Sequence, residues 1–402
     1  MCHAGGMADL DALLAEAQQL LPELVALRRA IHAEPELGLE LPKTRGKVLE
    51  RLEALPLEIE RHAKTSGVVA TLRGGRPGRS ILLRADMDAL PMPEDTGLPF
   101  ASKTPNAMHA CGHDAHTAML VGAAQLLAAR RAELPGSVVF MFQPGEEGQH
   151  GARCMLEEGL LEREPRVEAA FALHVAPEFR TGMIATRGGT LLASADVFEV
   201  KVRGKGGHAS MPHLCRDPIP AACAIVPALQ TFLTRSLAPS DPAVITVTML
   251  RAGTTNNVIP ETATLVGTIR AHSEAARESA HEGVHRVADG IARAHGVEAE
   301  VRLEPGYPVT VNDAGFESFV QGVARELLGP RSVVELPAPF MGAEDFSYVL
   351  QKVTGSMAVI GMRPPGNEPP APCHSNRMRI EESGMAHGAA LHAAVALRFL
   401  GA

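Results

Sequence analysis

The chain has 402 residues, which at about 150 residues per domain favours two domains. Apolar residues make up 46% and charged residues 21%, so the composition excludes a disordered chain and allows a sizeable core. The net charge of -8, without a dense basic block, argues against nucleic acid as a partner, and no apolar run of roughly 18 residues is present to span a membrane. The 17 histidines direct attention to metal and acid–base sites.

The cysteines are scattered rather than closely spaced, which is not typical of a small disulfide scaffold; they are Cys2, Cys111, Cys154, Cys215, Cys223 and Cys373. The N-terminal segment lacks the basic and apolar parts of a secretion signal, and its periodicity predicts an amphipathic helix. We therefore expect a cytoplasmic protein with reduced thiols.

The first half of the chain alternates strand and helix patterns. The predicted elements are strands at 67–73, 80–86 and 137–142, a turn at 74–78 and a helix at 117–132. Asp114 precedes this helix and is expected to cap it. Polar clusters follow the strands, and open α/β sheets place their sites at such carboxyl ends.

Near Gly188 the pattern changes to strands that alternate apolar and polar residues. The elements expected there are strands at 197–203, 244–249 and 264–270 and helices at 217–236 and 274–295. After Tyr307 the earlier pattern returns, with a helix at 316–328, a strand at 358–361 and a final helix. We predict an α/β fold with a discontinuous catalytic domain (1–187 and 305–402), whose mixed, mostly parallel sheet is flanked by helices, and an inserted α+β, ferredoxin-like domain (188–304).

The strongest chemical signal is the segment His109–His116, which holds three histidines, a cysteine and an aspartate. Cys111 and His113 can place a thiolate and an imidazole on one metal, because Gly112 between them lets the backbone bend sharply. One such histidine alone would be an ordinary structural residue; this density favours a metal site.

A pair of carboxylates, Glu146 and Glu147, follows the strand at 137–142. Adjacent carboxylates repel one another, so they are either solvated in a turn or matched by a counter-charge. A dinuclear metal site would supply that charge and separate their roles, one binding metal and the other holding a proton from water.

Two isolated histidines, His174 and His374, each follow apolar or small residues. A lone histidine is more often structural, but with Cys111, His113 and a glutamate these two would complete five ligands for two metals. Asp86 ends a predicted strand and could orient a histidine ligand, or simply cap a loop.

Through these residues the sequence resembles the metal-dependent amidohydrolases of the aminoacylase and hippurate hydrolase family. This family includes auxin-conjugate (IAA-amino acid) hydrolases and is related to carboxypeptidase G and succinyl-diaminopimelate desuccinylase. The resemblance extends over nearly the whole chain. It is carried by motifs in one order, at residues 28–37, 84–91, 110–116, 143–148, 204–210, 256–260, 342–346 and 374–375. It implies two divalent metals in the catalytic domain and an inserted domain that dimerises and acts as a lid.

Carried over residue by residue, the family's metal ligands fall on Cys111, His113, Glu147, His174 and His374. Glu146 matches the general acid/base and Asp86 the aspartate that supports the metals. The chain departs from distant relatives at Arg84, where they have a histidine ligand. The aminoacylase branch shares this change, which leaves the roles of Asp86 and Asp88 open.

In the inserted domain, His208 lies in a glycine-rich turn, where spacing alone favours a tolerated loop histidine. The resemblance instead implies an oxyanion donor supplied by the partner subunit. It also implies substrate contacts for Asn257, Arg270 and Gly342, with the Arg270 guanidinium as the clamp for an amino-acid carboxylate. Glu344 and Asp345 are expected to cap or brace the site.

The leading hypothesis is hydrolysis of N-acyl-L-amino acids by a cytoplasmic homodimer, possibly a dimer of dimers, that acts on small molecules and carries two divalent ions per subunit. Manganese or zinc is favoured for these ions, and cobalt or nickel is possible. A dipeptidase or carboxypeptidase would need the same centre. Cys111 as a metal-free nucleophile and a non-catalytic metal-binding protein are the alternatives from other classes.

Overall fold

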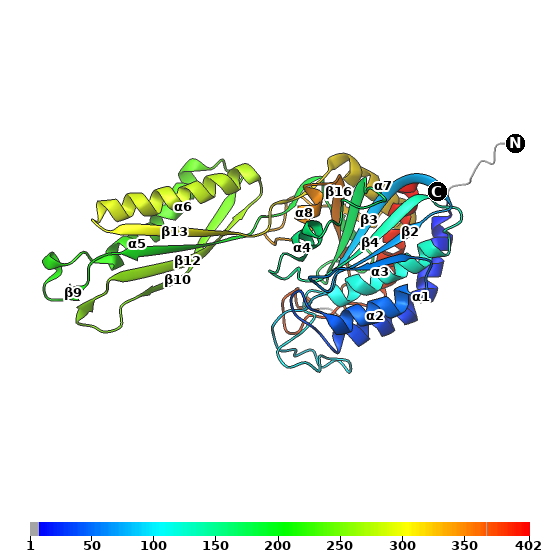
Figure 1. The fold of residues 1–402 in the computed structure, drawn as a ribbon, viewed down its shortest axis with the longest axis horizontal. Coiled ribbons are helices and arrows are strands. Elements are labelled where there is room, and N and C mark those ends of the chain that lie inside the picture. Colours follow the sequence, from blue (N-terminus) through cyan, green and yellow to red (C-terminus); the bar gives the residue numbers. More distant parts are fainter. Residues whose placement is uncertain (1–7, 367) are drawn as a thin grey trace. The chain divides into compact units, whose positions relative to one another are not determined.

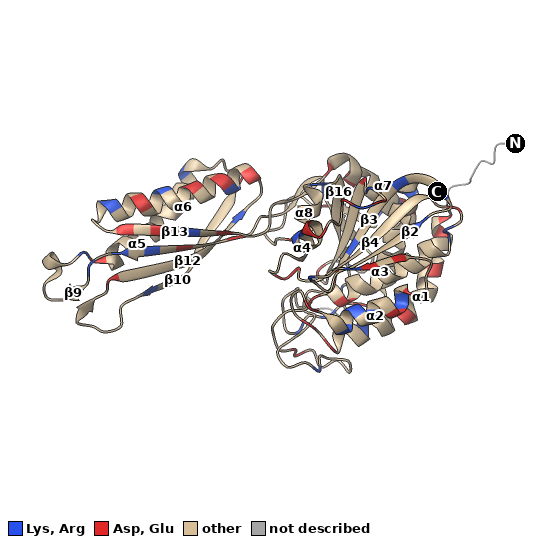
Figure 2. Ribbon diagram, in the orientation of Figure 1, with Lys and Arg blue, Asp and Glu red and all other residues tan. Residues whose placement is uncertain are grey.

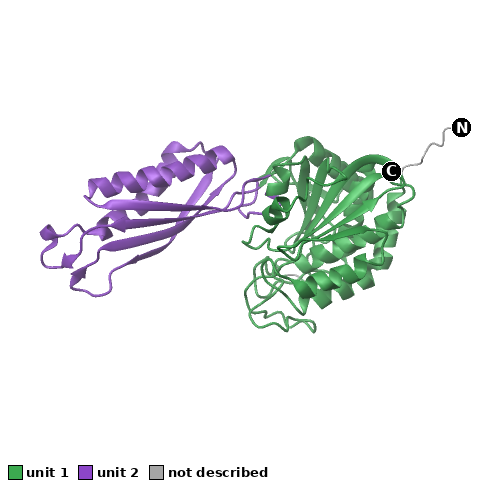
Figure 3. Ribbon diagram, in the orientation of Figure 1, with its two compact units in different colours: residues 1–191, 311–338, 348–402 green, residues 192–310, 339–347 purple. Residues whose placement is uncertain are grey.

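The computed structural model describes residues 8–366 and 368–402, so Cys2 lies outside the described residues. The chain divides into two compact units (Figure 3). Unit 1 comprises residues 1–191, 311–338 and 348–402, and unit 2 comprises residues 192–310 and 339–347. Within the described residues, no helix is long and apolar enough to cross a membrane.

Unit 1 is built on an eight-stranded sheet with the strand order β1-β2-β4-β3-β5-β16-β6-β15 (Figure 1). Its centre, from β4 to β16, is parallel, and antiparallel pairs occur on either side of that centre. The strands are β1 (Glu58–Arg61), β2 (Val68–Arg73), β3 (Arg76–Asp86), β4 (Pro135–Gln143), β5 (Ala169–Ala176), β6 (Ile184–Thr186), β15 (Val333–Glu335) and β16 (Gly355–Gly361). Two short strands, β7 (Gly189–Leu192) and β14 (Thr310–Asn312), pair separately.

Helices cover this sheet, and three of them, α1, α3 and α9, pack against one another. The helices of unit 1 are α1 (Leu10–His32), α2 (Pro42–Leu52), α3 (His113–Ala128), α4 (Gly151–Glu157), α7 (Ala314–Leu328) and α9 (Gly384–Leu400), while the short α8 (Ser347–Leu350) begins at the edge of unit 2. Helices α3 and α9 are buried almost all round, because alanine and leucine occupy every face. By contrast, α1 and α2 display charges of both signs (Figure 2).

Unit 2 has the βαββαβ order of a ferredoxin-like domain. Its elements are β8 (Asp196–Arg203), α5 (Pro218–Ser236), β10 (Ala243–Ala252), β12 (Thr262–Ala271), α6 (Glu274–Ala294) and β13 (Glu298–Pro305). The antiparallel sheet runs β10-β12-β8-β13, and alternate residues of β8 and β12 are buried against the two helices. A separate hairpin-like pair, β9 (Gly207–His208) and β11 (Val258–Ile259), and a 3-10 turn at Pro212–Leu214 complete the unit.

The predicted α/β fold class is confirmed, with local corrections. The predicted turn at 74–78 is too long, because β3 already begins at Arg76. The helix predicted from 117 begins at His113, after Gly112 in the left-handed region at φ 83°. Asp114 is therefore inside the helix and does not cap it. Strand β13 was not predicted, although its burial alternates as a half-buried strand should.

Candidate metal centre

The candidate ligands gather at the carboxyl ends of the parallel strands of unit 1. Asp86 is the last residue of β3, His174 lies in the second half of β5, and the Glu146–Glu147 pair follows β4. Parallel strands bring their carboxyl ends to one edge of a sheet, which is where open α/β folds place their sites. Helix α3 begins at this edge with His113.

The bend between Cys111 and His113 requires glycine. At Gly112 the backbone has φ 83°, and a Cβ atom there would lie 2.3 Å from Cγ2 of Val175. The bend leaves Cys111 Sγ 3.3 Å from Nε2 of His174. The thiol and the imidazole thus meet although they are far apart in sequence.

The tautomer of His174 follows from its second nitrogen. Nδ1 lies 2.7 Å from the carbonyl oxygen of Val175, and because a carbonyl only accepts, Nδ1 must carry the proton. Nε2 then presents a lone pair toward Cys111. Burial lowers the pKa of His174 to about 4, which keeps this ring neutral, as a metal ligand requires.

His113 and Glu147 carry buried polar atoms that the protein itself leaves unsatisfied. Both ring nitrogens of His113 and Oε1 of Glu147 have no hydrogen-bond partner among the described residues. Nε2 of His113 is 3.9 Å from Oε1 of Glu147, which in turn lies 3.3 Å from Nε2 of His374. Such orphaned donors and acceptors need an explanation, and a bound ion provides one.

Five three-residue groups among the described residues offer ligand atoms within 4.8 Å of one another. Two of them contain Cys111: one adds His113 and His174, the other Glu147 and His374. A further group joins His113, Glu146 and Glu147. Thiolate, imidazole and carboxylate donors suit divalent transition metals. The residues therefore fit two ions.

Electrostatics around His113 also indicate a place for positive charge. Burial disfavours the charged ring, yet Asp86, Asp88 and Glu147 outweigh burial and raise the pKa of His113 to about 10. In the chain without metal, a proton on His113 thus supplies the charge that a cation would supply. The pKa of the Cys111 thiol is raised as well, well above its usual value, by the Cys373 thiol, burial and the Glu146–Glu147 pair. A raised pKa keeps a thiol uncharged, whereas it keeps the His113 ring charged.

Asp86 is buried and held by charged neighbours. It accepts hydrogen bonds from Arg84 Nη1 at 2.7 Å and from His116 Nδ1 at 2.6 Å, and it lies 3.5 Å from Nε2 of His113. Although burial opposes ionisation, Arg84 and the two histidines keep the pKa of Asp86 well below its ordinary value. Arg84 neutralises this carboxylate and also donates to Gln143 at 2.9 Å.

Asp88 has a positioning role that the sequence analysis left open. Its two carboxylate oxygens accept the backbone N–H groups of Glu146 and Glu147, each at 2.9 Å, and Oδ1 lies 3.5 Å from Nδ1 of His113. Asp88 thus fixes the backbone that presents both glutamates and faces a candidate ligand as well.

Asp114 belongs to a buried ionic network instead of a helix cap. Its Oδ2 accepts from Arg28 Nε and His32 Nδ1, both at 2.7 Å, while Arg28 also donates to Glu382. These pairs tie α1 to the first turn of α3, which carries His113. Of the other histidines in the 109–116 segment, His109 lies outside the metal-ligand groups, with burial lowering its pKa to about 3.

The residues predicted in the inserted domain occupy two separate regions of unit 2. His208 in β9 pairs with Val258, its Nδ1 accepts from the Ser210 hydroxyl at 2.8 Å, and the Asn257 carbonyl accepts from the N–H of Ala209 at 3.1 Å. In the chain, β9 follows β8 and β11 precedes β12. His208 and Asn257 therefore lie beyond the end of the sheet at which Thr262 of β12 pairs with Arg203 of β8.

Arg270 lies near the other end of β12, opposite Val244. At about 3.4 Å per residue, its backbone is roughly 27 Å from Thr262 along the strand. Burial lowers the pKa of Arg270. Gly342 accepts from the N–H of Ala193 at 2.9 Å, and Glu344 accepts from the N–H of Phe346 at 3.0 Å, so the expected capping role fits Glu344.

Comparison with known proteins identifies the family. The chain is 38% identical over 406 residues to the IAA-amino acid hydrolase ILR1-like 4 of Arabidopsis thaliana, covering 99% of this chain and 91% of that protein. It is 42% identical over 339 residues to an N-acetylcysteine deacetylase of Bacillus subtilis (strain 168), covering 84% and 88%. The crystal structure of the Bacillus subtilis YXEP protein, described as a dinuclear metal binding peptidase, superposes with a TM-score of 0.83 at 36% identity, covering 96% and 99%. Residues 82–398 match the sequence model of peptidase family M20/M25/M40, and the chain belongs to this family of metal-dependent hydrolases.

Proposed function

We propose that this enzyme hydrolyses the amide bond of N-acyl-L-amino acids, releasing a carboxylic acid and a free amino acid. The observation that carries the proposal is the convergence of Cys111, His113, Glu147, His174 and His374 beside Glu146 at one edge of the sheet. The relatives named for IAA-amino acids and N-acetylcysteine support an N-acyl amino acid as the substrate class.

Bound divalent ions supply a Lewis acid and lower the pKa of water. Glu146 is the residue proposed to move the proton: its carboxylate accepts a proton from the attacking water and then delivers it to the departing nitrogen. Glu146 is buried beside His113 and Glu147, where it can reach a water molecule held at the candidate centre. The hydrogen bonds from its backbone and that of Glu147 to Asp88 hold the two glutamates in fixed, different positions.

We assign substrate contacts to His208, Asn257, Arg270 and Gly342, and propose that a homodimer completes each site. The distance along β12 between the His208 region and Arg270 supports this arrangement, because one copy of unit 2 does not bring both to a single small substrate. His208 from the partner copy would stabilise the oxyanion, and Arg270 would bind the amino-acid carboxylate through two parallel donors.

The native ion is proposed to be manganese or zinc, with cobalt and nickel as alternatives, since a set of thiolate, imidazole and carboxylate donors accepts all four. A cytoplasmic location is also proposed, and the absence of disulfides among the five described cysteines agrees with it.

A substrate panel tests the proposal. Metal-stripped protein reloaded separately with each ion is assayed against N-acetyl-L-amino acids, longer acyl derivatives and unblocked dipeptides. Faster turnover of blocked amino acids supports the proposal, whereas faster turnover of dipeptides identifies a dipeptidase. Full activity in EDTA would support the metal-free cysteine hydrolase, a reading that the raised pKa of Cys111 disfavours.

A further inference from the structure

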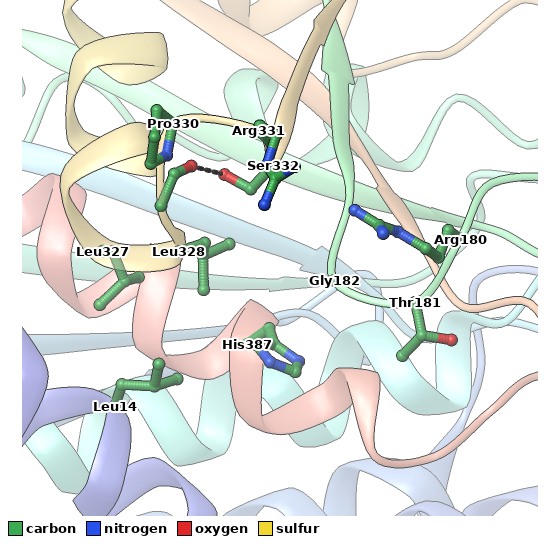
Figure 4. Close-up of a pocket in the computed structure, with 11 residues that line it drawn as sticks. Leu14, Arg180, Thr181, Gly182, Leu327, Leu328, Pro330, Arg331, Ser332 and His387 are labelled. Carbon is green, nitrogen blue, oxygen red and sulfur yellow. Dashed lines mark hydrogen bonds between the residues drawn. The ribbon is translucent and has the colours of Figure 1, made fainter.

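Unit 1 contains an open pocket of about 370 Å³ that none of the candidate metal ligands lines. Four segments form it: Leu14 of α1, the loop between β5 and β6, the end of α7 with the loop that follows it, and the first turn of α9 (Figure 4). Its volume is in the range of pockets that hold small molecules.

The polar lining of this pocket is cationic. Arg180 from the β5–β6 loop and Arg331 from the loop after α7 both contribute guanidinium groups, and the Arg180 side chain extends toward the Arg331 side of the pocket in Figure 4. Neither guanidinium makes an ion pair or hydrogen bond with another residue in the described part of the chain, and no Asp or Glu lines the pocket. Both side chains are exposed, so water screens the repulsion between them, and both charges are available to an anion that enters the pocket.

His387, in the first turn of α9, adds a neutral donor or acceptor. Its ring lies against Gly182, where a Cβ atom would come within 3.5 Å of it. Nδ1 is buried without a hydrogen-bond partner among the described residues. Burial lowers the pKa of His387, so near neutral pH the ring is uncharged and can donate one hydrogen bond. The Thr181 hydroxyl lies on the same side as Arg180 (Figure 4), but it already donates to the carbonyl of Arg363 at 3.1 Å.

A purely structural explanation accounts for only part of this arrangement. Arg331 follows the end of α7, where a cation is stabilised by the helix dipole. The Ser332 hydroxyl, which lines the pocket, already donates to the carbonyl of Gly329 at 2.6 Å and so caps that helix end. Neither interaction explains Arg180, which comes from a different segment, or the unsatisfied nitrogen of His387.

We propose that this pocket binds a small dianion, either a phosphate monoester or a dicarboxylate, between Arg180 and Arg331. Two guanidinium groups balance two negative charges, and each can hold a pair of anionic oxygens through parallel N–H groups. His387 would donate a hydrogen bond to one of the remaining oxygens of the ligand. The site is distinct from the metal centre and does not depend on the proposed substrate.

The test is a calorimetric titration of the full, metal-loaded chain at low and constant ionic strength, with inorganic phosphate and with succinate as probes. Arg180→Gln and Arg331→Gln should each weaken binding of the preferred probe by on the order of 10-fold, the effect of losing a charge-assisted hydrogen bond. Arg166→Gln is the matched control, because Arg166 is an exposed arginine of unit 1 outside the pocket. Circular dichroism verifies that each variant is folded. Arg180→Lys keeps the charge but cannot donate two parallel hydrogen bonds, so its affinity should lie between those of wild type and Arg180→Gln.

A preference for phosphate would identify a phosphate monoester as the ligand class, and a preference for succinate a dicarboxylate. The proposal is wrong if neither probe binds wild type at millimolar concentration. It is also wrong if the two pocket variants bind as tightly as wild type, which would place the anion elsewhere, for example at the metals. Equal weakening in Arg166→Gln would show a general charge effect and would overturn it as well.

Discussion

Nδ1 of His116 lies 2.6 Å from Oδ1 of Asp86, and both side chains are buried. Asp86 is ionised, so the histidine nitrogen donates, and Nε2 of the same ring accepts the backbone N–H of Val175 at 2.8 Å. Both nitrogens of His116 are therefore used within the protein. His116 holds Asp86 in place and is not itself available as a ligand.

Replacing His116 tests this distinction. His116→Ala should weaken metal binding by roughly 10- to 100-fold, the usual effect of removing a residue that orients ligands, whereas His113→Ala should remove an ion altogether. The measurement is metal content per chain after dialysis against buffers of defined free metal. His285→Ala, an exposed histidine of unit 2, is the control. Loss of a whole ion in His116→Ala even at high free metal would show that His116 is a ligand.

The thiol of Cys111 should report metal occupancy. When metal is bound, the thiol is protected. Once a chelator removes the metal, the thiol is released and reacts slowly at neutral pH, because burial and the Glu146–Glu147 pair raise its pKa even where Cys373 is replaced. The other five cysteines, including the neighbouring Cys373, are first replaced by serine, and alkylation is followed by mass. Rapid alkylation of the fully loaded enzyme would point instead to a nucleophilic cysteine.

A buried histidine far along the chain predicts an acid-sensitive fold. Burial beside Phe171 lowers the pKa of His392 to about 3, while the unfolded chain protonates this ring near 6.5. The folded state thus binds fewer protons between these values, and stability is lost as pH falls from 6.5 toward 3. At pH 5 the loss is about 2 kcal/mol for this residue.

Urea unfolding of the metal-free chain at pH 7 and pH 5 measures the effect. His392→Leu should lose less stability between the two pH values than wild type does, by that same amount. Because the free energies of unfolding at the two pH values are compared within each protein, the cost of altered packing in His392→Leu cancels. An identical pH dependence in the two proteins would mean that His392 does not stay neutral in the fold.

Subunit mixing tests the contribution of His208 from a partner copy. His208→Ala and Glu146→Gln should each be nearly inactive. The turnover rate of His208→Ala should fall by roughly 10²–10³-fold, the effect of removing one oxyanion donor. In a heterodimer of the two, one site lacks both groups and the other retains both, so activity should return. A mixture of Glu146→Gln and Glu147→Ala should stay inactive, because both residues belong to the same chain's centre. If mass confirms exchange and no activity returns, His208 acts within its own chain or is structural.

Regular periodicity made most of the fold predictable from the sequence. The alternating strands β8 and β12 and the alanine-rich helices α3 and α9 follow the patterns that predict them. The start of α3 was predicted too late, because Gly112 reverses the chain earlier than the apolar pattern indicates. Strand β13 escaped prediction because its polar face carries several charges.

The candidate centre was predictable only in part from the residues themselves. Cys111 and His113 stand out because only Gly112 separates them, whereas His174 and His374 are single residues that were proposed because they complete a set of five ligands. The role of Asp88 could not be read from the sequence, since it binds the backbone of residues 58 and 59 positions further along the chain. Such contacts become visible only when the strands lie side by side.

The most direct test of the account compares Glu146→Gln with Glu147→Ala by measuring metal content and hydrolysis of an N-acetyl-L-amino acid on the same samples. Glu146→Gln should retain both ions and lose turnover by roughly 10²–10⁴-fold, because an amide cannot accept the proton. Glu147→Ala should lose metal and turnover together. Near-normal turnover in Glu146→Gln, or equal metal depletion in both variants, would contradict the division of roles between these adjacent carboxylates.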